Sequence, residues 1–203
     1  MRLTRLLYPC LVLLIAGLCL SEISAKSLQD IRVGRTHFGY RFNAGIDSTV
    51  NGTSYDAGYH GVFMGYTYRF KNNEKNTGRL TWDTSFNVAA LSDDSGPLKG
   101  ARFGFRTGLG YEYLIAEQML LKLDLGVDMC RVSTESTLPS LVADEDSWEY
   151  GGHVDASLIY FVHPGVSVFG SVGMESLSDQ SFQTIELDSG NSITFSTGIF
   201  FPW

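Results

Sequence analysis

Ser54, Asp56 and His60 are the residues of this sequence that come nearest in type to a catalytic set. Serine acyl chemistry needs a hydroxyl nucleophile within reach of a base, and a third polar group that orients the base. Such a set at the rim of a membrane protein would suit acyl transfer to or from a lipid. Polar loops also bring these residue types together by chance, so the favoured expectation is that the trio has no catalytic role.

The other candidate groups favour structural roles. His153 and Asp155 share one face of an alternating segment, which predicts a hydrogen bond between them. His163 precedes a Pro-Gly pair and is expected in a turn. The acidic clusters Asp93–Asp94 and Asp144–Asp146 have the oxygen ligands that divalent cations prefer, but solvated acidic loops explain them more simply. No metal site and no cofactor are predicted.

The first 25 residues have the order of a secretory signal peptide. Arg2 and Arg5 precede an apolar run too short to span a bilayer, and small residues end at Ala25, after which cleavage is expected. Residues 26–203 then form one domain. Without Arg2, Arg5 and Glu22, the 15 basic and 22 acidic residues fall to 13 and 21. An acidic chain without a basic cluster argues against nucleic acid as a partner.

Eight segments of the remaining chain alternate between apolar and polar residues with the period of two that indicates a β-strand. Most are close to the length of about nine to eleven residues that a tilted strand needs to cross a bilayer. No apolar run after residue 25 is long enough for a membrane helix, so a membrane-spanning form must use strands. The segments are residues 33–46, 59–70, 79–91, 101–114, 119–131, 148–162, 166–176 and 191–201.

The connections between these segments alternate in length. Bacterial outer-membrane barrels have this layout, with short periplasmic turns and long outer loops. The predicted fold class is therefore all-β, an eight-stranded antiparallel up-and-down transmembrane β-barrel. The short connections are residues 72–77, 115–118 and 163–165, and the long ones are 47–58, 92–100, 132–147 and 177–190.

The charges of each segment fall on one face and the apolar side chains on the other. A soluble barrel would turn the apolar face inward, and a membrane barrel would turn it outward. Glycines on the polar face and aromatic residues near the short turns favour the membrane barrel. The apolar face of the first segment consists of Phe38, Tyr40, Phe42, Ala44 and Ile46. The expected aromatic girdle consists of Tyr68, Phe70, Tyr111, Tyr113, Tyr160, Phe201 and Trp203.

The polar faces predict a charged lumen. Eight strands enclose a bore just wide enough for side chains to fill, and buried charges must be paired there. The favoured interpretation is a plug of ion pairs, and the alternative is a selective path for ions. The predicted lumen residues are Arg35, Arg41, Arg69, Arg79, Asp83, Arg102, Arg106, Glu112, Lys122, Asp124, Asp128, Glu149, Asp155 and Glu175.

The sequence ends in NSITFSTGIFFPW, a strand with apolar and aromatic residues at alternate positions. Phe195, Ile199, Phe201 and Trp203 are predicted to form the signal by which the outer-membrane assembly machinery recognises a barrel. The last strand is also expected to pair with the first, because this pairing removes both free edges. Pro202 cannot donate a backbone hydrogen bond, so the pairing is expected to end at Phe201.

The eight strands, alternating loop lengths, charged lumen and terminal aromatic strand resemble the small eight-stranded outer-membrane barrels, the group of the OmpA transmembrane domain, OmpX and the opacity proteins. The resemblance covers residues 26–203 and rests on pattern. It implies a location in the outer membrane of a diderm bacterium, in contact with lipid and lipopolysaccharide, with both termini in the periplasm.

The roles that the resemblance implies range over envelope integrity, adhesion and host contact, and the favoured hypothesis is a non-enzymatic role in envelope structure or adhesion. The connections 132–147 and 177–190 are the longest and contain apolar residues, so a host or surface ligand is expected to bind there. A narrow pore for ions or small solutes is the alternative. A lipid A acyltransferase or deacylase is less favoured, because the His-x-Ser pairing associated with the deacylases is absent from this sequence.

Overall fold

The structure, a computed structural model, describes residues 34–50, 52–70, 78–93, 98–136, 145–178, 180–181, 185–188 and 191–202. The expected cleavage site after Ala25 and the terminal Trp203 lie outside these residues. The described residues form strands and turns. The strands are β1 (Gly34–Val50), β2 (Thr53–Arg69), β3 (Gly78–Asp93), β4 (Leu98–Ala116), β5 (Met119–Ser136), β6 (Glu145–His163), β7 (Val166–Leu177), β8 (Gln180–Ser181), β9 (Ile185–Asp188) and β10 (Ser192–Pro202).

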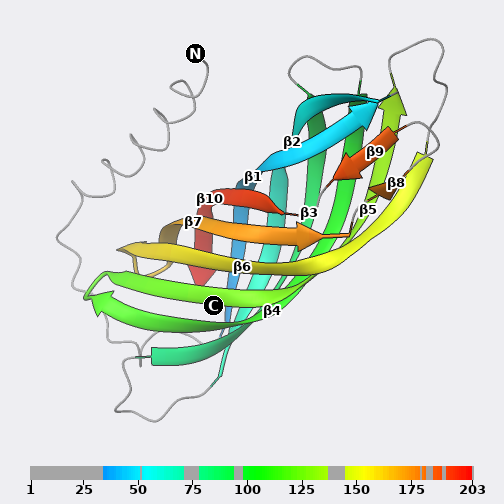
Figure 1. Ribbon diagram of the computed structural model, residues 1–203. Coiled ribbons are helices and arrows are strands. Elements are labelled where there is room, and N and C mark those ends of the chain that lie inside the picture. Colours follow the sequence, from blue (N-terminus) through cyan, green and yellow to red (C-terminus); the bar gives the residue numbers. More distant parts are fainter. Residues whose placement is uncertain are drawn as a thin grey trace.

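Eight long strands close into one barrel (Figure 1). Strands β1 to β7 pair with their neighbours in chain order, and β10 pairs with β7 on one side and with β1 on the other. All of these pairings are antiparallel. The predicted up-and-down barrel with eight strands is therefore confirmed, including the pairing of the last strand with the first.

The outer surface of the barrel is apolar. On β5, Leu121, Leu123, Leu125, Val127 and Met129 are 37–64% exposed, and the charged residues between them are buried. Soluble monomers rarely expose a contiguous apolar surface of this extent. An apolar exterior of this extent fits a lipid environment. It excludes a soluble barrel, in which the apolar face of each strand would point inward. Among the described residues, no helix is long and apolar enough to cross a membrane.

Exposed aromatic side chains gather on the outer face of the barrel near the short turns. Such a band is typical of the level where lipid headgroups meet the hydrocarbon region. Tyr160, which is partly exposed, also donates a hydrogen bond of 2.9 Å to Gln118 in the turn before β5. The exposed members that were predicted are Tyr68, Phe70, Tyr111, Tyr113 and Phe201, and Trp82 adds to them.

One prediction of facing is wrong. Ile46 was expected on the lipid-facing side of β1, but it is 1% exposed and lies inside the barrel. The register between β1 and β2 shifts between Asn43 and Ile46, where two residues of β1 oppose the single Gly58. Gly45 has a φ of +82°, a conformation that glycine adopts without steric cost. This β-bulge reverses the alternation beyond it.

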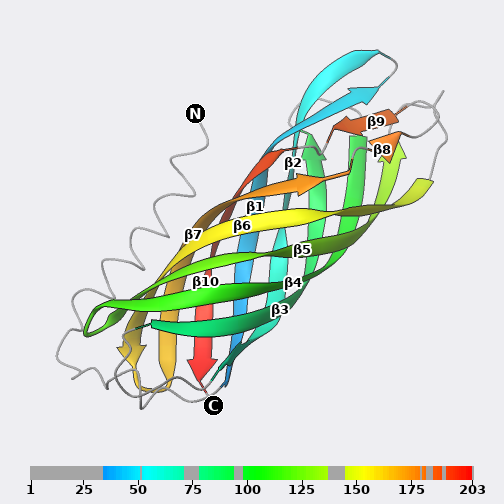
Figure 2. The same cartoon turned by 60° about the horizontal axis from the view of Figure 1, so that its bottom comes forward.

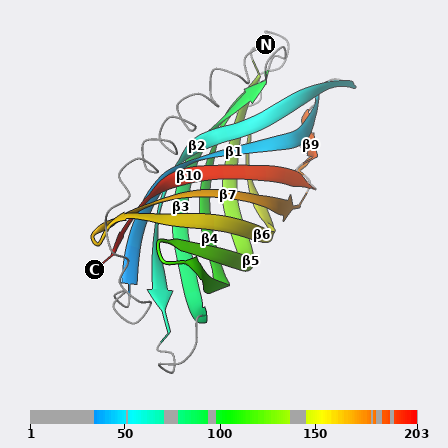
Figure 3. The ribbon, with the colours of Figure 1, turned by 90° about the vertical axis from the view of Figure 1, so that its left-hand side faces the viewer.

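The outer ends of the strands extend further than predicted. Most of residues 47–58 belong to β1 and β2, which form a hairpin up to Val50 and Thr53. Gly52, with a φ of +76°, lies in the turn of this hairpin, in a conformation that glycine adopts without steric cost. The hairpin projects beyond the neighbouring strands in Figures 2 and 3. Within residues 177–190, β9 pairs with the outer part of β1, and β8 pairs with β9.

The expectation that pairing ends at Phe201 is also wrong. Pro202 lies opposite Arg35 in the β1–β10 pairing, one position beyond the pair of Phe201 with Thr36. On the other side of β10, the pairing with β7 ends at Phe200. Pro202 has no backbone N–H, but at the end of β10 it can keep its register with β1, because no hydrogen bond from it to β7 is needed there.

Candidate functional site

All fourteen predicted lumen residues lie on the inner face of the barrel. Ten of these side chains are buried, and Arg41, Arg79, Asp83 and Asp155 are partly exposed. Alternation alone determines this facing, because successive side chains of a strand point to opposite sides. The partners of each charge depend in addition on how the eight strands are staggered, and the structure supplies them.

Arg106 is the centre of the largest group of ion pairs. Its Nε donates to Asp128 at 2.6 Å, its Nη1 donates to Asp155 at 2.7 Å, and its Nη2 lies 3.4 Å from a carboxylate oxygen of Glu175. The three acids come from β5, β6 and β7, so one side chain of β4 connects four strands across the lumen. A planar guanidinium suits this role, because its five N–H groups point in fixed directions.

Arg102 extends this group toward the outer end. Its Nη2 donates to Glu175 and to the thiol of Cys130, and its Nε lies 3.6 Å from Glu149. Glu175 also accepts a hydrogen bond of 2.5 Å from the side-chain amide of Asn43 on β1. Glu175 is therefore linked to three side chains, Arg102 and Arg106 of β4 and Asn43 of β1, so two guanidinium groups compensate its buried negative charge.

Lys122 joins two acids in the middle of the barrel. Its Nζ lies 2.6 Å from Asp83 and 3.3 Å from Asp124. Asp83 also accepts hydrogen bonds from the hydroxyls of Thr67 at 2.5 Å and Thr81 at 3.0 Å. These hydroxyls were not singled out in the sequence, although their inward parity on β2 and β3 would have identified them.

His153 lies between two aspartates, and neither of them is the predicted partner Asp155. Its Nδ1 is 3.0 Å from Asp128 and its Nε2 is 3.0 Å from Asp124. The expected hydrogen bond with Asp155 is wrong, because Asp155 accepts instead from Arg106 and from Thr194 at 3.1 Å. Neighbours on the same face of one strand are about 7 Å apart, whereas side chains on adjacent strands approach more closely.

Apolar side chains occupy the lumen on both sides of these charges. Phe63, Phe169 and Phe200 fill the half near the short turns, where their rings surround His37. They were missed because they are aromatic residues on a face expected to be polar. One cluster consists of Phe63, Leu120, Ile159, Phe169 and Phe200, and the other, near the outer end, consists of Ile46, Ala57, Tyr59, Leu91 and Val132.

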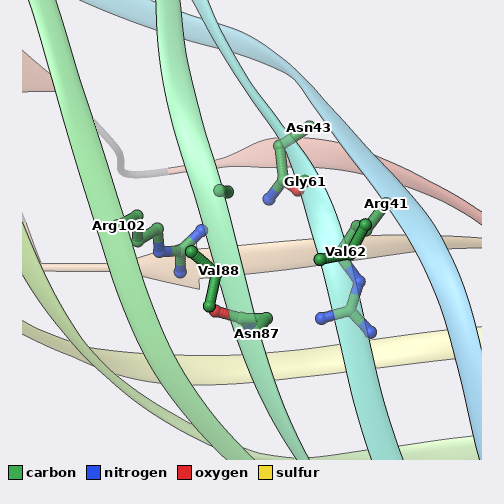
Figure 4. Close-up of a pocket in the computed structure, with 8 residues that line it drawn as sticks. Arg41, Asn43, Gly61, Val62, Asn87, Val88 and Arg102 are labelled. Carbon is green, nitrogen blue, oxygen red and sulfur yellow. The ribbon is translucent and has the colours of Figure 1, made fainter.

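A small cavity remains beside the charged groups. Its volume is about 10 Å³ for the centre of a water molecule, which is room for roughly one water. Figure 4 shows Arg41, Asn43, Asn87 and Arg102 around it, with Gly61 in the wall. This cavity is too small for a hydrated ion.

The trio of Ser54, Asp56 and His60 cannot form a serine–histidine pair. All three residues lie on β2, and Ser54 and His60 are six residues apart in an extended strand, which is about 20 Å. The hydroxyl of Ser54 is instead 3.2 Å from that of Thr49 on β1. His163 is exposed as the last residue of β6, directly before the predicted turn, and its Nδ1 accepts a hydrogen bond of 3.2 Å from Gly165 N.

The acidic clusters of the outer connections lie partly outside the described residues. Asp146 is exposed and pairs with Arg131, and this hydrogen bond holds the pKa of the Asp146 carboxyl below its usual value. Both residues lie beyond the apolar belt of the barrel. In the part of the chain that the structure describes, no group of three or more His, Cys, Asp or Glu side chains is placed to hold a metal ion.

The apolar exterior, the aromatic girdle and the filled, charge-paired interior define a class, the membrane-embedded eight-stranded β-barrel. No protein-family model and no curated protein matches the sequence. Among solved structures, Neisserial surface protein A (NspA) is similar at 13% identity and a TM-score of 0.54, over 83% of this chain and 97% of that chain. OprG from Pseudomonas aeruginosa is similar at 11% identity and a TM-score of 0.51, over 85% and 97%.

These likenesses show the fold of the small outer-membrane barrels and nothing finer, because the identities are low. The chain folds as one of these barrels. The similarity covers almost the whole of both solved structures and most of this chain, so the expected resemblance to the group of small eight-stranded barrels is confirmed at the level of the fold.

We expect the refolded protein to show no steady, sizeable conductance in planar bilayers. Both halves of the lumen contain buried apolar clusters, and the charges between them are paired, so hydrated ions have no continuous path. Single-channel recording in concentrated potassium chloride measures this directly, with detergent alone as the control. A stable conductance that scales with salt concentration would favour the narrow pore instead.

Proposed function

We propose that this chain is an integral outer-membrane protein of a diderm bacterium that binds surface partners through the strands above its apolar belt. The short-turn end and both termini face the periplasm in this proposal. The role is non-enzymatic and belongs to adhesion or envelope structure. The observation that carries the proposal is a filled lumen combined with strands that extend beyond the barrel wall.

The filled lumen supports a function on the surface. Ion pairs and apolar clusters occupy the interior, so a partner must be met outside it. A rigid barrel is a suitable scaffold for recognition by the segments that it presents. The wide separation of Ser54 and His60 supports a non-enzymatic role at the outer rim.

The outer ends of β1 and β2 extend past the pairing of β2 with β3. The pairing of β2 with β1 continues to Thr53, whereas the pairing of β2 with β3 starts at Ala57. On the other side of β1, β9 and β8 continue the projecting sheet, with β8 at its edge (Figures 1 and 2). An exposed edge of this kind can bind an extended segment of another protein by adding it as a strand.

Removing the projecting hairpin is expected to abolish adhesion without unfolding the barrel. Ile46 and Ala57 are register partners, so residues 47–56 can be replaced by a two-residue Asn-Gly turn that joins β1 directly to β2. Cells that produce this variant should adhere to epithelial monolayers no better than cells without the protein. Heat-modifiable migration on gels establishes that the barrel still folds.

The matched control replaces residues 72–77, at the opposite end of the barrel, by a Gly-Ser segment of the same length. This variant should adhere as well as the full chain. Undiminished adherence of a folded barrel that lacks residues 47–56 would exclude the hairpin as the binding segment. A lipid A mass profile that changes with the gene would favour the lipid-modifying enzyme over the proposed role.

A further inference from the structure

The charges of the lumen balance in number, but they are unevenly distributed along the barrel. At the short-turn end, Arg35 of β1 and Arg69 of β2 both donate to the same carboxylate, that of Glu112 on β4. Arg79 of β3 lies directly opposite Glu112 in the β3–β4 pairing. Two guanidinium groups therefore share one carboxylate, with a third arginine at the paired position of β3, and the described lumen residues at this end have a surplus of positive charge.

The two inner guanidinium groups also have hydrogen-bond donors that Glu112 does not reach. The side chains of Arg35 and Arg69 are 0% exposed. The Nε and Nη1 of Arg35, and the Nη1 and Nη2 of Arg69, are buried and have no hydrogen-bond partner among the described residues. Buried polar groups are nearly always hydrogen-bonded in proteins, so donors of this kind indicate an acceptor that binds there.

The acceptor does not come from the next acid of the lumen. Asp83 follows Arg79 and Thr81 along the inner face of β3, but it is already bonded to Lys122, Thr67 and Thr81. On the other side of Arg35, the ring of Phe200 lies 4.5 Å from the guanidinium carbon. A ring face stabilises the cation but leaves the in-plane N–H groups of Arg35 without acceptors.

We propose that Arg35, Arg69 and Arg79 form a binding site for a phosphate-type oxyanion at the short-turn end of the barrel. A tetrahedral oxyanion has several acceptor oxygens, and guanidinium groups bind it through pairs of parallel N–H donors. Arg79 is partly exposed and borders the site on its open side. The site lies at the end opposite the proposed adhesive hairpin, so it is independent of that function.

The test measures the thermal midpoint of the folded barrel, refolded as the full chain in detergent micelles and followed by heat-modifiable migration. Sodium phosphate, titrated against sodium chloride at constant ionic strength, should raise the midpoint saturably. Arg69→Gln should remove this phosphate-dependent rise. The matched control is Arg131→Gln, which removes an exposed arginine at the other end of the barrel and should leave the rise unchanged.

A second arm distinguishes the source of the phosphate. If only vesicles that contain phosphatidylglycerol stabilise the protein, relative to phosphatidylcholine, and Arg69→Gln loses this effect, the ligand is a lipid headgroup. Saturation by soluble phosphate identifies a free oxyanion. If Arg69→Gln does not fold, Arg79→Gln at the partly exposed position replaces it. A midpoint that responds to neither source, or equally in Arg69→Gln and Arg131→Gln, overturns the proposal.

Discussion

Arg106→Met should destabilise the barrel by about 3–5 kcal/mol, the cost of removing one partner from a buried ion pair. Arg106 is 5% exposed and compensates three carboxylates, those of Asp128, Asp155 and Glu175. Its loss leaves three negative charges close together in a poorly solvated lumen. The free energy of unfolding is measured by urea titration of the protein in lipid vesicles, with tryptophan fluorescence as the signal.

Two further variants separate the loss of charge from the loss of geometry. Arg106→Lys keeps the positive charge but has no planar group to reach three acids, so its effect should be intermediate. Arg131→Met removes the exposed pair with Asp146 and should change stability little, because water screens such pairs. Equal effects of Arg106→Met and Arg131→Met would show that the lumen charges are solvated rather than mutually compensated.

Gly198→Val should prevent the barrel from closing. Gly198 of β10 lies opposite Gly39 of β1, at the pairing that joins the last strand to the first. A Cβ atom at position 198 would come within 2.1 Å of the backbone oxygen of Phe38 and 2.7 Å of Gly39 Cα. Backbone atoms cannot move aside as the end of a flexible side chain can, so β10 would be forced away from β1.

The two glycines also make room for the interior. A Cβ at Gly39 would meet the ring of Phe63 at 2.7 Å, and one at Gly198 would meet the ring of Phe169 at 2.7 Å. These rings belong to the apolar cluster near the short turns. Because Gly39 and Gly198 have no side chains, the rings of Phe63 and Phe169 can pack directly against the backbone of β1 and β10, as expected where interiors are closely packed.

The matched control is Gly170→Val on β7, the strand next to β10. Gly170 is exposed on the lipid-facing surface, and a Cβ there has no atom within 4 Å. Gly170→Val should give the same heat-modifiable band as the parent chain, and Gly198→Val should give only the unfolded band. A normal folded band for Gly198→Val would contradict the close approach of β1 and β10.

The alternation of the sequence was sufficient to predict which side of the barrel almost every strand residue faces. The inward placement of Arg106 and the outward placement of Phe201 follow from their parity alone. Ile46 is an exception, because a β-bulge at Gly45 shifts the parity and leaves no clear trace in the pattern of apolar residues. The lengths of β1 and β2 were underestimated at their outer ends, because the part of a strand that lies beyond the apolar belt is polar and has the composition of a loop.

The eight strands, their antiparallel order and the side that their residues face could be predicted from the sequence, because these depend on a local period of two and on loop length. The contacts inside the barrel could not be predicted in this way. His153 bonds Asp124 and Asp128 rather than Asp155, and Glu112 is shared by Arg35 and Arg69. These partners lie on different strands, and their meeting depends on the stagger accumulated around the closed barrel, which no local pattern of residues encodes.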